Sequence, residues 1–534
     1  MRVYFSPADR VRYKEYLSLN AKYQSLGRKI DTANDCRDLF SLQQAIKDCQ
    51  DYINATKDPL EISILYYLQA NAWSGRKQRN SWNWDPKTDR QSLIANRNAV
   101  RYAEKIQEQI PAQELARRYT NLANETDEAG LFIEAGEWYD KALSCQSNKG
   151  VALFNKGISL AHYSGHLFGD WEQRVFAHEA AFWFQEAIRV GSLDLQEEFF
   201  PVDVLKRKYA WFFELSQPVR LQNVTEKLNF AGIELEYRRW VVEHKLFLNP
   251  LNDICTKAVN RYVLEDSLTT PSFTFQTGSK RAYLPLRINQ LKQEFIAART
   301  LFFEGITSTQ EHYSDHCTHL ESHPMFSGSI YAFYVEKIKC AFRSAYSLFD
   351  KIAEILAAMY DLGGKRNTYF RTFWYENEDY HNPLKSFFST DSKSWNFNRP
   401  NWPLRALFSI ANDFLSNEHD WRDSVDEEIK DITTVRNALE HSGLDVRMFG
   451  DSKLQEGVIT FHDLLERTIY LLKKSRNAII YLILAIHCES LRESEQDNEL
   501  RMPLQGQPYS IDDIIEDGIS GLVDVCYAEK NRKI

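Results

Sequence analysis

The sequence has few of the residues that make tight turns. Only 21 glycines and 15 prolines occur among its 534 residues, whereas sandwiches and barrels of β-strands need many such turns. Long stretches of the sequence contain no glycine or proline, and 13% of the residues are aromatic. This scarcity argues against an all-β fold and predicts an all-α protein. The length, at about 150 residues per domain, predicts three to four domain-sized units.

Paired cysteines, an excess of positive charge and long apolar runs are also missing. The eight cysteines form no C-x-x-C pair, which predicts reduced thiols and no disulfide framework. The net charge of −9 argues against a polyanion-binding surface over the whole molecule and leaves room for a local basic cleft. The most hydrophobic run, residues 478–486, is too short to span a bilayer, and residues 1–30 lack the apolar region of a signal peptide. We therefore expect a cytoplasmic protein with no membrane segment.

A recurrence of small and aromatic residues at helical spacing marks the N-terminal part. Two copies place an aromatic residue between two alanines at steps of four and three, and two others repeat these steps with other residues. The small residues let two helices approach closely. The copies are Ala135, Tyr139 and Ala142; Ala180, Phe184 and Ala187; Ala99, Ala103 and Ile106; and, more weakly, Ala45, Cys49 and Tyr52. The pattern predicts stacked helical pairs.

The spacing of this recurrence resembles that of degenerate tetratricopeptide (TPR) repeats. Ala123 and Gly157 occupy equivalent positions one tetratricopeptide period apart. The longer interval between Ala135 and Ala180 predicts an insertion around residues 163–172. The resemblance covers about residues 42–190, and we expect a repeat domain over residues 1–245. A helical bundle without repeats is the alternative.

The C-terminal half shows apolar stripes typical of bundle helices. We expect a junction at 246–283, a helical bundle at 284–495 and a tail at 496–534. Within the bundle the stripes and turn-formers predict helices over 284–305, 329–362, 403–415, 425–441 and 461–491. Long antiparallel helices with one apolar stripe each form a bundle.

The clearest candidate site is a polar cluster near the end of the helix over 425–441. Arg436, Asn437, Glu440 and His441 share one broad face of an α-helix that Gly443 ends, with Arg436 and His441 about 140° apart. The negative end of the helix dipole favours a protonated histidine, which suits a general acid or base. Arginine matches phosphate oxygens. The cluster therefore suggests metal-free cleavage of RNA, whereas a salt bridge at a helix end is the structural alternative.

This cluster resembles the R-N-x-x-x-H signature of the HEPN superfamily of helical-bundle nucleases. The resemblance covers about residues 284–495 and extends to the segments 337–352, 373–375, 401–407 and 471–487. It implies that Arg436 and His441 are the catalytic pair, with Asn437 as a supporting polar residue. It also implies a homodimer, in which two such motifs face each other across one composite cleft.

Two further groups of side chains are weaker candidates. Lys473, Lys474 and Arg476 lie on the long helix expected beside Arg436 and could contact RNA together with Glu440, or simply form a solvated face. A stripe of histidines, His312, His316, His319 and His323, has helical spacing. A pair such as His312 and His316 could bind zinc with another ligand, but four in one stripe cannot converge on one ion. A solvated or dimer-facing polar stripe is favoured there, and we expect no metal or other cofactor.

Together these features predict a metal-independent endoribonuclease that uses the ribose 2′-hydroxyl as its nucleophile. Proteins of this arrangement resemble bacterial toxins or antiviral-defence effectors, in which the repeats sense a trigger or a protein or peptide partner. Two alternatives are an inert adaptor that binds protein or RNA, and a metal-dependent hydrolase at the histidine stripe.

Overall fold

The structure is a computed structural model that describes most of the chain. The described residues are 7–77, 85–146, 150–190, 210, 212, 220–221, 230–257, 261–272, 279–307, 328–362, 368–385, 388, 401–415 and 427–496. Most of them lie in α-helices, and two strands of three residues each are the only strands in these ranges. The predicted all-α fold is confirmed.

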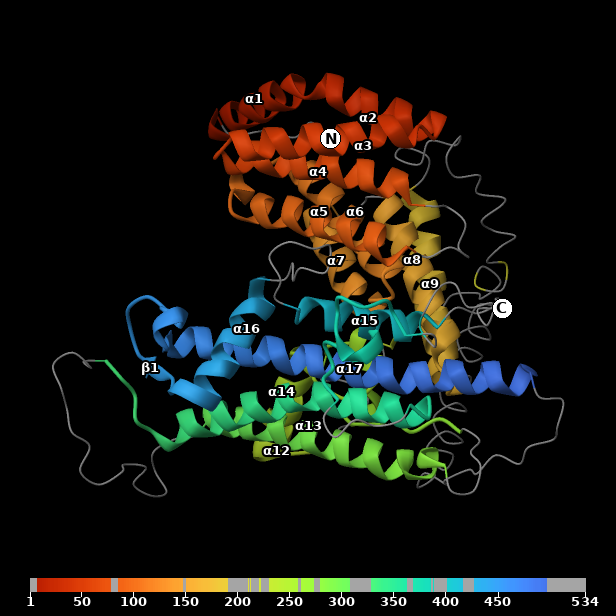
Figure 1. Ribbon diagram of the computed structural model, residues 1–534, viewed down its shortest axis with the longest axis vertical. Helices are drawn as coiled ribbons and strands as arrows, with labels where there is room; N and C mark the ends of the chain where they lie inside the picture. The colour runs from red at the N-terminus through yellow and green to blue at the C-terminus, as the bar shows by residue number, and fades with distance from the viewer. Residues whose placement is uncertain are drawn as a thin grey trace, which may run out of the picture.

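The N-terminal helices stack as pairs of sequence neighbours in the upper part of Figure 1. α4 packs on α5, α6 on α7, and α8 on α9. The helices are α1 (Pro7–Lys22), α2 (Gln24–Cys36), α3 (Leu39–Ala55), α4 (Pro59–Arg76), α5 (Pro86–Glu104), α6 (Ala112–Glu128), α7 (Phe132–Cys145), α8 (Gly150–His166) and α9 (Asp170–Val190). Such pairing suggests helical repeats, and their assignment as tetratricopeptide repeats stays a prediction.

Side-chain caps fix where several of these helices begin. Asp38 accepts hydrogen bonds from the backbone N–H groups of Phe40 and Ser41. Asp58 and Asp85 do the same before α4 and α5, and a proline follows each of them at the first helical position. These caps satisfy N–H groups that have no partner within the helix, and the proline ring presets the helical backbone angle. The starts of the helices are therefore encoded locally.

The small residues singled out in the sequence lie where the helices come closest. A Cβ atom on Gly157 of α8 would lie 2.6 Å from the ring of Phe184 in α9, so only glycine permits this contact. Ala135 and Ala180 are completely buried, whereas Tyr52 of the weakest copy is exposed. The insertion expected around residues 163–172 is not an inserted loop. Those residues complete α8 and begin a longer α9.

The C-terminal half is a bundle in which the helix α17 (Phe461–Gln496) crosses the molecule beside α13 (Leu284–Thr307) and α14 (Phe333–Met359). α12 (Gly232–Glu243), α15 (Trp402–Asp413) and α16 (Glu427–Asn437) complete it. The expected apolar stripe of α14, which includes Ile338, Phe342 and Ile352, is buried. Between α16 and α17 the strands β1 (Asp445–Arg447) and β2 (Val458–Thr460) pair in parallel, with Val446 opposite Ile459.

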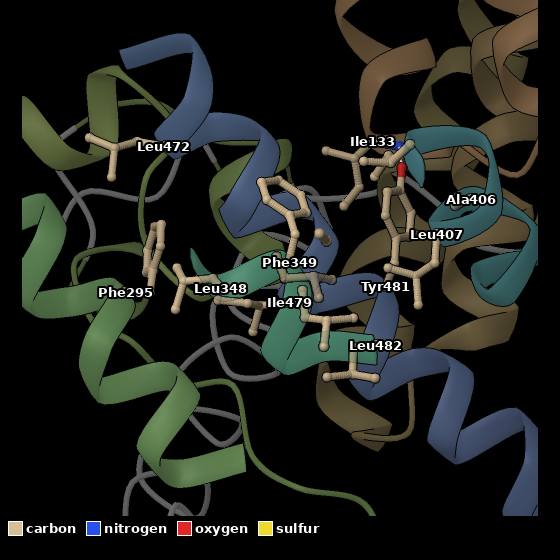
Figure 2. Packing of buried hydrophobic residues seen from close by; sticks show 14 of the residues in the cluster. Ile133, Phe295, Leu348, Phe349, Ala406, Leu407, Leu472, Ile479, Tyr481 and Leu482 are labelled. Carbon is tan, nitrogen blue, oxygen red and sulfur yellow. Dashed lines mark hydrogen bonds between the residues drawn. The ribbon is translucent and has the colours of Figure 1, made fainter. Parts of the chain in front are cut away.

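One hydrophobic core joins the last N-terminal helices to the bundle. Its buried residues run from Leu131 in the turn before α7 to Ile486 of α17. Figure 2 shows Ile133 of α7 beside Tyr481 of α17 and Leu407 of α15. A second cluster extends from Tyr16 to Ala152 and belongs to the earlier helices. The two halves of the chain are thus packed together through apolar contact.

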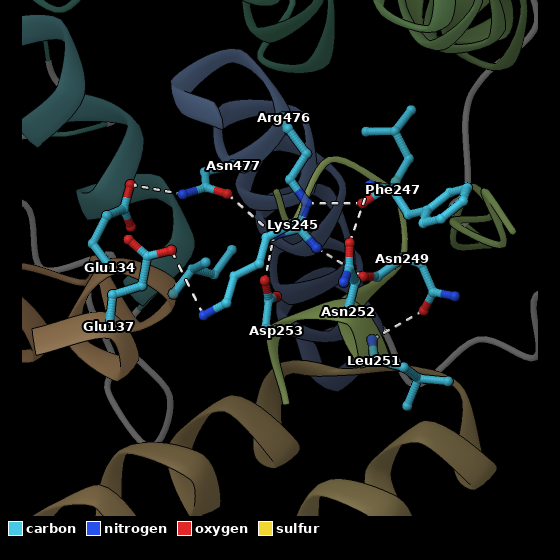
Figure 3. A network of polar contacts seen from close by, with 12 residues as sticks. Glu134, Glu137, Lys245, Phe247, Asn249, Leu251, Asn252, Asp253, Arg476 and Asn477 are labelled. Atoms are coloured by element: carbon cyan, nitrogen blue, oxygen red, sulfur yellow. Dashed lines mark hydrogen bonds and ion pairs between the residues drawn. The ribbon is translucent and has the colours of Figure 1, made fainter. Parts of the chain in front are cut away.

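A buried polar network, which we call the junction network, reinforces this contact (Figure 3). The Arg476 side chain donates to the carbonyl oxygens of Phe247 (2.8 Å) and Asn249 (2.7 Å) and forms an ion pair with Asp253. Tyr481 donates to Glu134 at 2.6 Å. Every part of the Arg476 guanidinium group is therefore engaged in the interior.

The helix α15 lies between the N-terminal helices and α17. Its last residue, Asp413, is buried and forms ion pairs with Arg90 and Arg97 of α5. A Cβ atom on Gly130, whose φ is +86°, would lie 2.4 Å from the carbonyl oxygen of Trp402, where α15 begins. None of the helices in the described ranges is both long and apolar enough to cross a membrane.

Candidate active site at the end of helix α16

The helix that carries Arg436 and Asn437 changes its pitch directly after them. α16 ends at Asn437, and the next five residues, Ala438–Ser442, form a π turn. The backbone N–H of Gly443 donates to the carbonyl of Ala438 at 2.7 Å, and Gly443 has a φ of +84°. Gly443 therefore ends the helix, as the sequence predicts, but through a wider turn than expected. Such π turns occur frequently at functional sites.

The π turn changes the angle between Arg436 and His441. In a regular α-helix two residues five apart are separated by about 140°. A turn closed by a bond between residues five apart rotates less per residue, so it reduces this separation. Ala438 and Leu439 are buried, and Glu440 and His441 are exposed.

Arg343 of α14 holds the π turn in place. One of its terminal nitrogens donates to the carbonyl oxygen of Leu439 at 2.8 Å, and its Nε atom lies 3.5 Å from the Glu440 carboxylate. The carbonyl groups in the last turn of a helix lack partners within the helix, so an arginine from a neighbouring helix stabilises the turn. Glu440 is thus placed in an ion pair with Arg343.

The chain that leaves the turn is also fixed. The backbone N–H of Ile330 donates to the carbonyl of Val446 in β1 at 2.8 Å, and that of Met448 donates to Gly328 at 2.9 Å. The segment before α14 therefore pairs with β1. Arg343 of α14 therefore holds the π turn itself, and the segment before α14 holds the chain that follows the turn.

A cavity of about 400 Å³ opens beside Arg436, and we call it the α14–α16 cavity. Arg436 and Asn437 form one wall, and Tyr346 and Asp350 of α14 form another, with Arg371 nearby. The Arg436 guanidinium carbon lies 5.6 Å from the centre of the Tyr346 ring, and Arg436 donates to the Asn437 side chain at 3.1 Å. The structure thus brings Arg436 and Asn437 together at a cavity.

The electrostatics of this cavity are unbalanced. Asp350 is its one acidic lining residue, against two arginines. Burial raises the pKa of the Asp350 carboxyl, while the Phe370 N–H, Arg371 and Arg436 favour its charged form and offset part of that rise. Burial likewise raises the pKa of Tyr346, against the opposing effect of Arg436. The cavity carries a net positive charge.

His441 lies outside the cavity wall, on the exposed side of the π turn. No hydrogen bond or ion pair joins its ring to any other residue that the structure describes. The ring is therefore accessible to a substrate or to a second copy of the chain. Together, Arg436, Asn437 and His441 place a guanidinium group, an amide and an imidazole along one helix end.

The basic residues predicted on α17 are placed differently from the prediction. Arg476 is fully buried in the junction network, so its predicted contact with RNA is wrong. Lys474 is only 8% exposed. Burial alone would raise the pKa of Glu137 in α7, but Lys245, Lys473 and Lys474 outweigh that effect and hold it below its ordinary value. Lys473 and Lys474 therefore act on an acidic residue of α7.

The remaining candidate from the sequence is a metal site at the histidine stripe. His312, His316, His319 and His323 lie outside the described residues. Within the described ranges, no group of three or more histidine, cysteine or acidic side chains is arranged to hold a metal ion.

Several site residues were missed by sequence reasoning. Arg371, Asp350 and Tyr346 line the cavity, and Arg343 holds the π turn. They are far from Arg436 in the chain, and no local pattern marks them. The only available signal was that Tyr346 and Asp350 fall between apolar positions of the helix predicted over 329–362.

A helical bundle that presents an Arg-Asn-x-x-x-His segment at the end of a helix with one buried face is typical of a HEPN domain. Residues 275–489 match the family model described as LA2681-like HEPN, so this part of the chain is a HEPN domain of that kind, and the expected resemblance is confirmed. Neither the curated proteins nor the solved structures include a match to the chain. The HEPN domain associates the chain with RNA cleavage as a class of activity.

Proposed function

We propose that the protein is a metal-independent endoribonuclease whose active site contains Arg436, Asn437 and His441. The observation that carries this proposal is the pairing state of the motif. Arg436 has no carboxylate at ion-pair distance among the described residues, and His441 has no partner there. By contrast, Arg476, which holds the fold together, has a partner at each of its guanidinium nitrogens. An unneutralised arginine beside an accessible histidine fits a site for a phosphodiester.

The proposed reaction needs no group beyond the RNA and these side chains. The ribose 2′-oxygen attacks the adjacent phosphorus and forms a new P–O bond, while the bond to the 5′-oxygen breaks. A histidine takes the 2′-hydroxyl proton, and a protonated acid supplies one to the leaving 5′-oxygen. Arg436 neutralises the charge that develops on the phosphate, with Asn437 positioning its guanidinium group through their hydrogen bond. The products carry 2′,3′-cyclic phosphate and 5′-hydroxyl ends.

The motif supplies one histidine for two proton transfers, which favours a homodimer with two motifs in one cleft. Apolar side chains exposed near the motif support this arrangement. Met448 and Phe449 follow β1 directly and are 53% and 71% exposed, and Tyr331 and Phe333 before and at the start of α14 are also exposed. Exposed apolar patches mark protein interaction sites. We expect Phe449→Ser to shift the protein from dimer to monomer in light scattering and to reduce cleavage with it.

A role as a bacterial toxin or antiviral-defence effector extends this proposal. The stacked pairs α4–α9 provide a surface that could receive a peptide or protein trigger, as helical repeats commonly do. The last of these helices share one hydrophobic core with the bundle, so that binding of a trigger to the repeats could affect the HEPN domain through direct packing.

The proposal is tested by incubating the full chain with transfer RNA and total RNA in excess chelator. We expect cleavage with cyclic phosphate ends, reduced about a hundredfold or more in His441→Ala. His462→Ala is the matched control, because His462 is exposed on α17, is not part of the motif and lies at ion-pair distance from Glu466 of its own helix. Cleavage that persists in His441→Ala would contradict the assignment. Absence of cleavage by the parent under all triggers tested would favour the adaptor.

A further inference from the structure

The α14–α16 cavity has features that the proposed cleavage of a phosphodiester alone does not require. Its volume of about 400 Å³ lies within the range of small-ligand sites. It lies between α14, the segment 369–371, the end of α15 and α16. A site that holds only a phosphate group would need far less space.

Aromatic rings form the apolar part of this cavity. The rings of Phe349 and Phe414 lie 4.7 Å apart, those of Phe349 and Phe370 lie 5.4 Å apart, and that of Tyr346 lies 5.6 Å from Phe414. The three phenylalanines are buried, whereas Tyr346 is half-buried and Tyr369 is exposed at the cavity edge. Such rings can stack with a flat heterocycle, as aromatic side chains do with the bases of single-stranded nucleic acids.

The two arginines supply the charge for an anion. Neither Arg371 nor Arg436 forms an ion pair with a described residue, although both act electrostatically on Asp350. Arg371 is exposed and lies in a segment separate from α16. Two arginines from different segments can hold one phosphate from two sides.

Asp350 provides a directed hydrogen-bond acceptor inside the cavity. One of its carboxylate oxygens accepts from the backbone N–H of Phe370 at 2.9 Å. The other oxygen has no hydrogen-bond partner among the described residues. An aspartate in this state can accept a hydrogen bond from the amino group of a base, as carboxylates do from cytosine.

We infer that the α14–α16 cavity binds one nucleotide whose base carries an amino group, with the phosphate between Arg371 and Arg436 and the amino group on Asp350. The inference rests on the proposed function for the source of this nucleotide, which is RNA at the cleavage site. Arg371 is then a positioning residue, and Asp350 a residue that determines specificity. Cytosine and uracil are the sharpest pair, because they have the same size and opposite hydrogen-bonding groups, an amino donor beside an acceptor nitrogen in cytosine and a carbonyl acceptor beside an N–H donor in uracil.

The experiment measures binding of CMP and UMP to the full chain by calorimetry, and cleavage of oligoribonucleotides that contain a single cytidine or uridine. We expect CMP to bind about tenfold or more tightly than UMP, and cleavage to show the same preference. Asp350→Asn keeps an oxygen for the Phe370 N–H and adds a donor for the uracil carbonyl, so it should remove or reverse this preference. Equal affinity for CMP and UMP, or an unchanged preference in Asp350→Asn, would overturn the inference.

A second variant keeps the test independent of Asp350. Arg371→Gln changes an exposed side chain and should weaken the binding of CMP and the binding of UMP by similar factors. Arg287→Gln, an exposed arginine on α13 outside the cavity, serves as the control and should change neither. Loss of binding in both variants, or in neither, would contradict the role of Arg371.

The two proposals fail in different ways. Nucleotide binding with the expected preference but no cleavage would contradict the nuclease and leave the cavity inference standing. Cleavage that requires His441 but shows no base preference would support the nuclease and contradict the cavity inference. Competitive inhibition of cleavage by CMP would support RNA as the source of the nucleotide, and binding of CMP without competition would overturn that part.

Discussion

Arginines occupy two contrasting regions of this molecule, the junction network around Arg476 and the α14–α16 cavity around Arg436. In the junction network the Arg476 side chain is completely buried and bonded to two carbonyl oxygens and a carboxylate. In the cavity Arg371 and Arg436 remain without an ion pair among the described residues. The difference separates side chains that hold the fold from those available to a ligand.

The contrast follows from the free-energy cost of burying charge. A buried arginine without partners would be strongly destabilising, so burial demands saturation. An arginine at the edge of a cavity keeps part of its hydration and can stay unpaired at low cost. Pairing state therefore distinguishes the two regions better than residue type, and substitutions in the two should have opposite effects on stability and activity.

The largest expected effect is that of Arg476→Leu. This substitution leaves the Asp253 carboxylate and the Phe247 and Asn249 carbonyl groups without their partner. We expect the free energy of unfolding to fall by about 3–5 kcal/mol, measured by urea denaturation followed by circular dichroism. A loss below about 1 kcal/mol would show that the junction network is not the stabilising region that its burial indicates.

The next largest effect on stability is expected for Asp413→Asn, and its size depends on pH. Burial would raise the pKa of the Asp413 carboxyl, but Arg90 and Arg97 lower it to about 2, below the ordinary value of about 3.9. A lowered folded-state pKa stabilises the protein above the unfolded pKa, and this stabilisation is lost as the pH falls toward 2. We expect Asp413→Asn to cost about 2 kcal/mol at pH 7 and progressively less below pH 4. A cost that does not change with pH would argue against the ion pairs as its origin.

A smaller loss is expected for Tyr481→Phe at the same junction. Its hydroxyl donates to Glu134 at 2.6 Å and accepts from the backbone N–H of Ile133 at 3.0 Å. Removing the hydroxyl leaves both groups without this partner in a buried site, at a cost of about 1–2 kcal/mol. Thermal unfolding of the two proteins under one set of conditions measures this difference. No change would mean that water replaces the hydroxyl.

The smallest effect on stability is expected in the cavity. Arg436→Gln and Arg371→Gln remove charges that no described carboxylate neutralises, so the free energy of unfolding should stay within about 0.5 kcal/mol of the parent. Cleavage should nevertheless be lost in Arg436→Gln. Urea denaturation and the RNA assay on the same samples check both statements, and a destabilised Arg436→Gln would place this arginine with the structural ones.

Local patterns made much of the fold predictable. Capping residues, turn-formers and apolar stripes are encoded within one helix, and α13 and α17 begin at the expected residues. The segment from Arg436 to His441 was found because it is continuous in the sequence. The π turn was not expected, because it is stabilised in part by Arg343 from another helix.

Side-chain direction could not be obtained in the same way. Lys473, Lys474 and Arg476 look like a basic cluster in the sequence, but their surroundings come from segments hundreds of residues away, as in the contact of Arg476 with Asn249. The cavity was missed for a related reason. Tyr346, Arg371 and Arg436 belong to three segments that only the tertiary structure brings together.

The distribution of buried apolar residues also has a consequence for how the molecule unfolds. The cluster that contains α13, α14 and α17 also contains the buried residues of α9, most of those of α8 and the first two of α7, whereas the other buried residues of α7 cluster with those of the earlier helices. Cooperative unfolding follows shared burial. The thermodynamic boundary should therefore fall at α7, whose buried residues are shared between the clusters, well before residue 275, where the family match begins. A HEPN domain cut out at that residue would lose the start of α7 and the helices α8, α9 and α12 from its own cooperative unit.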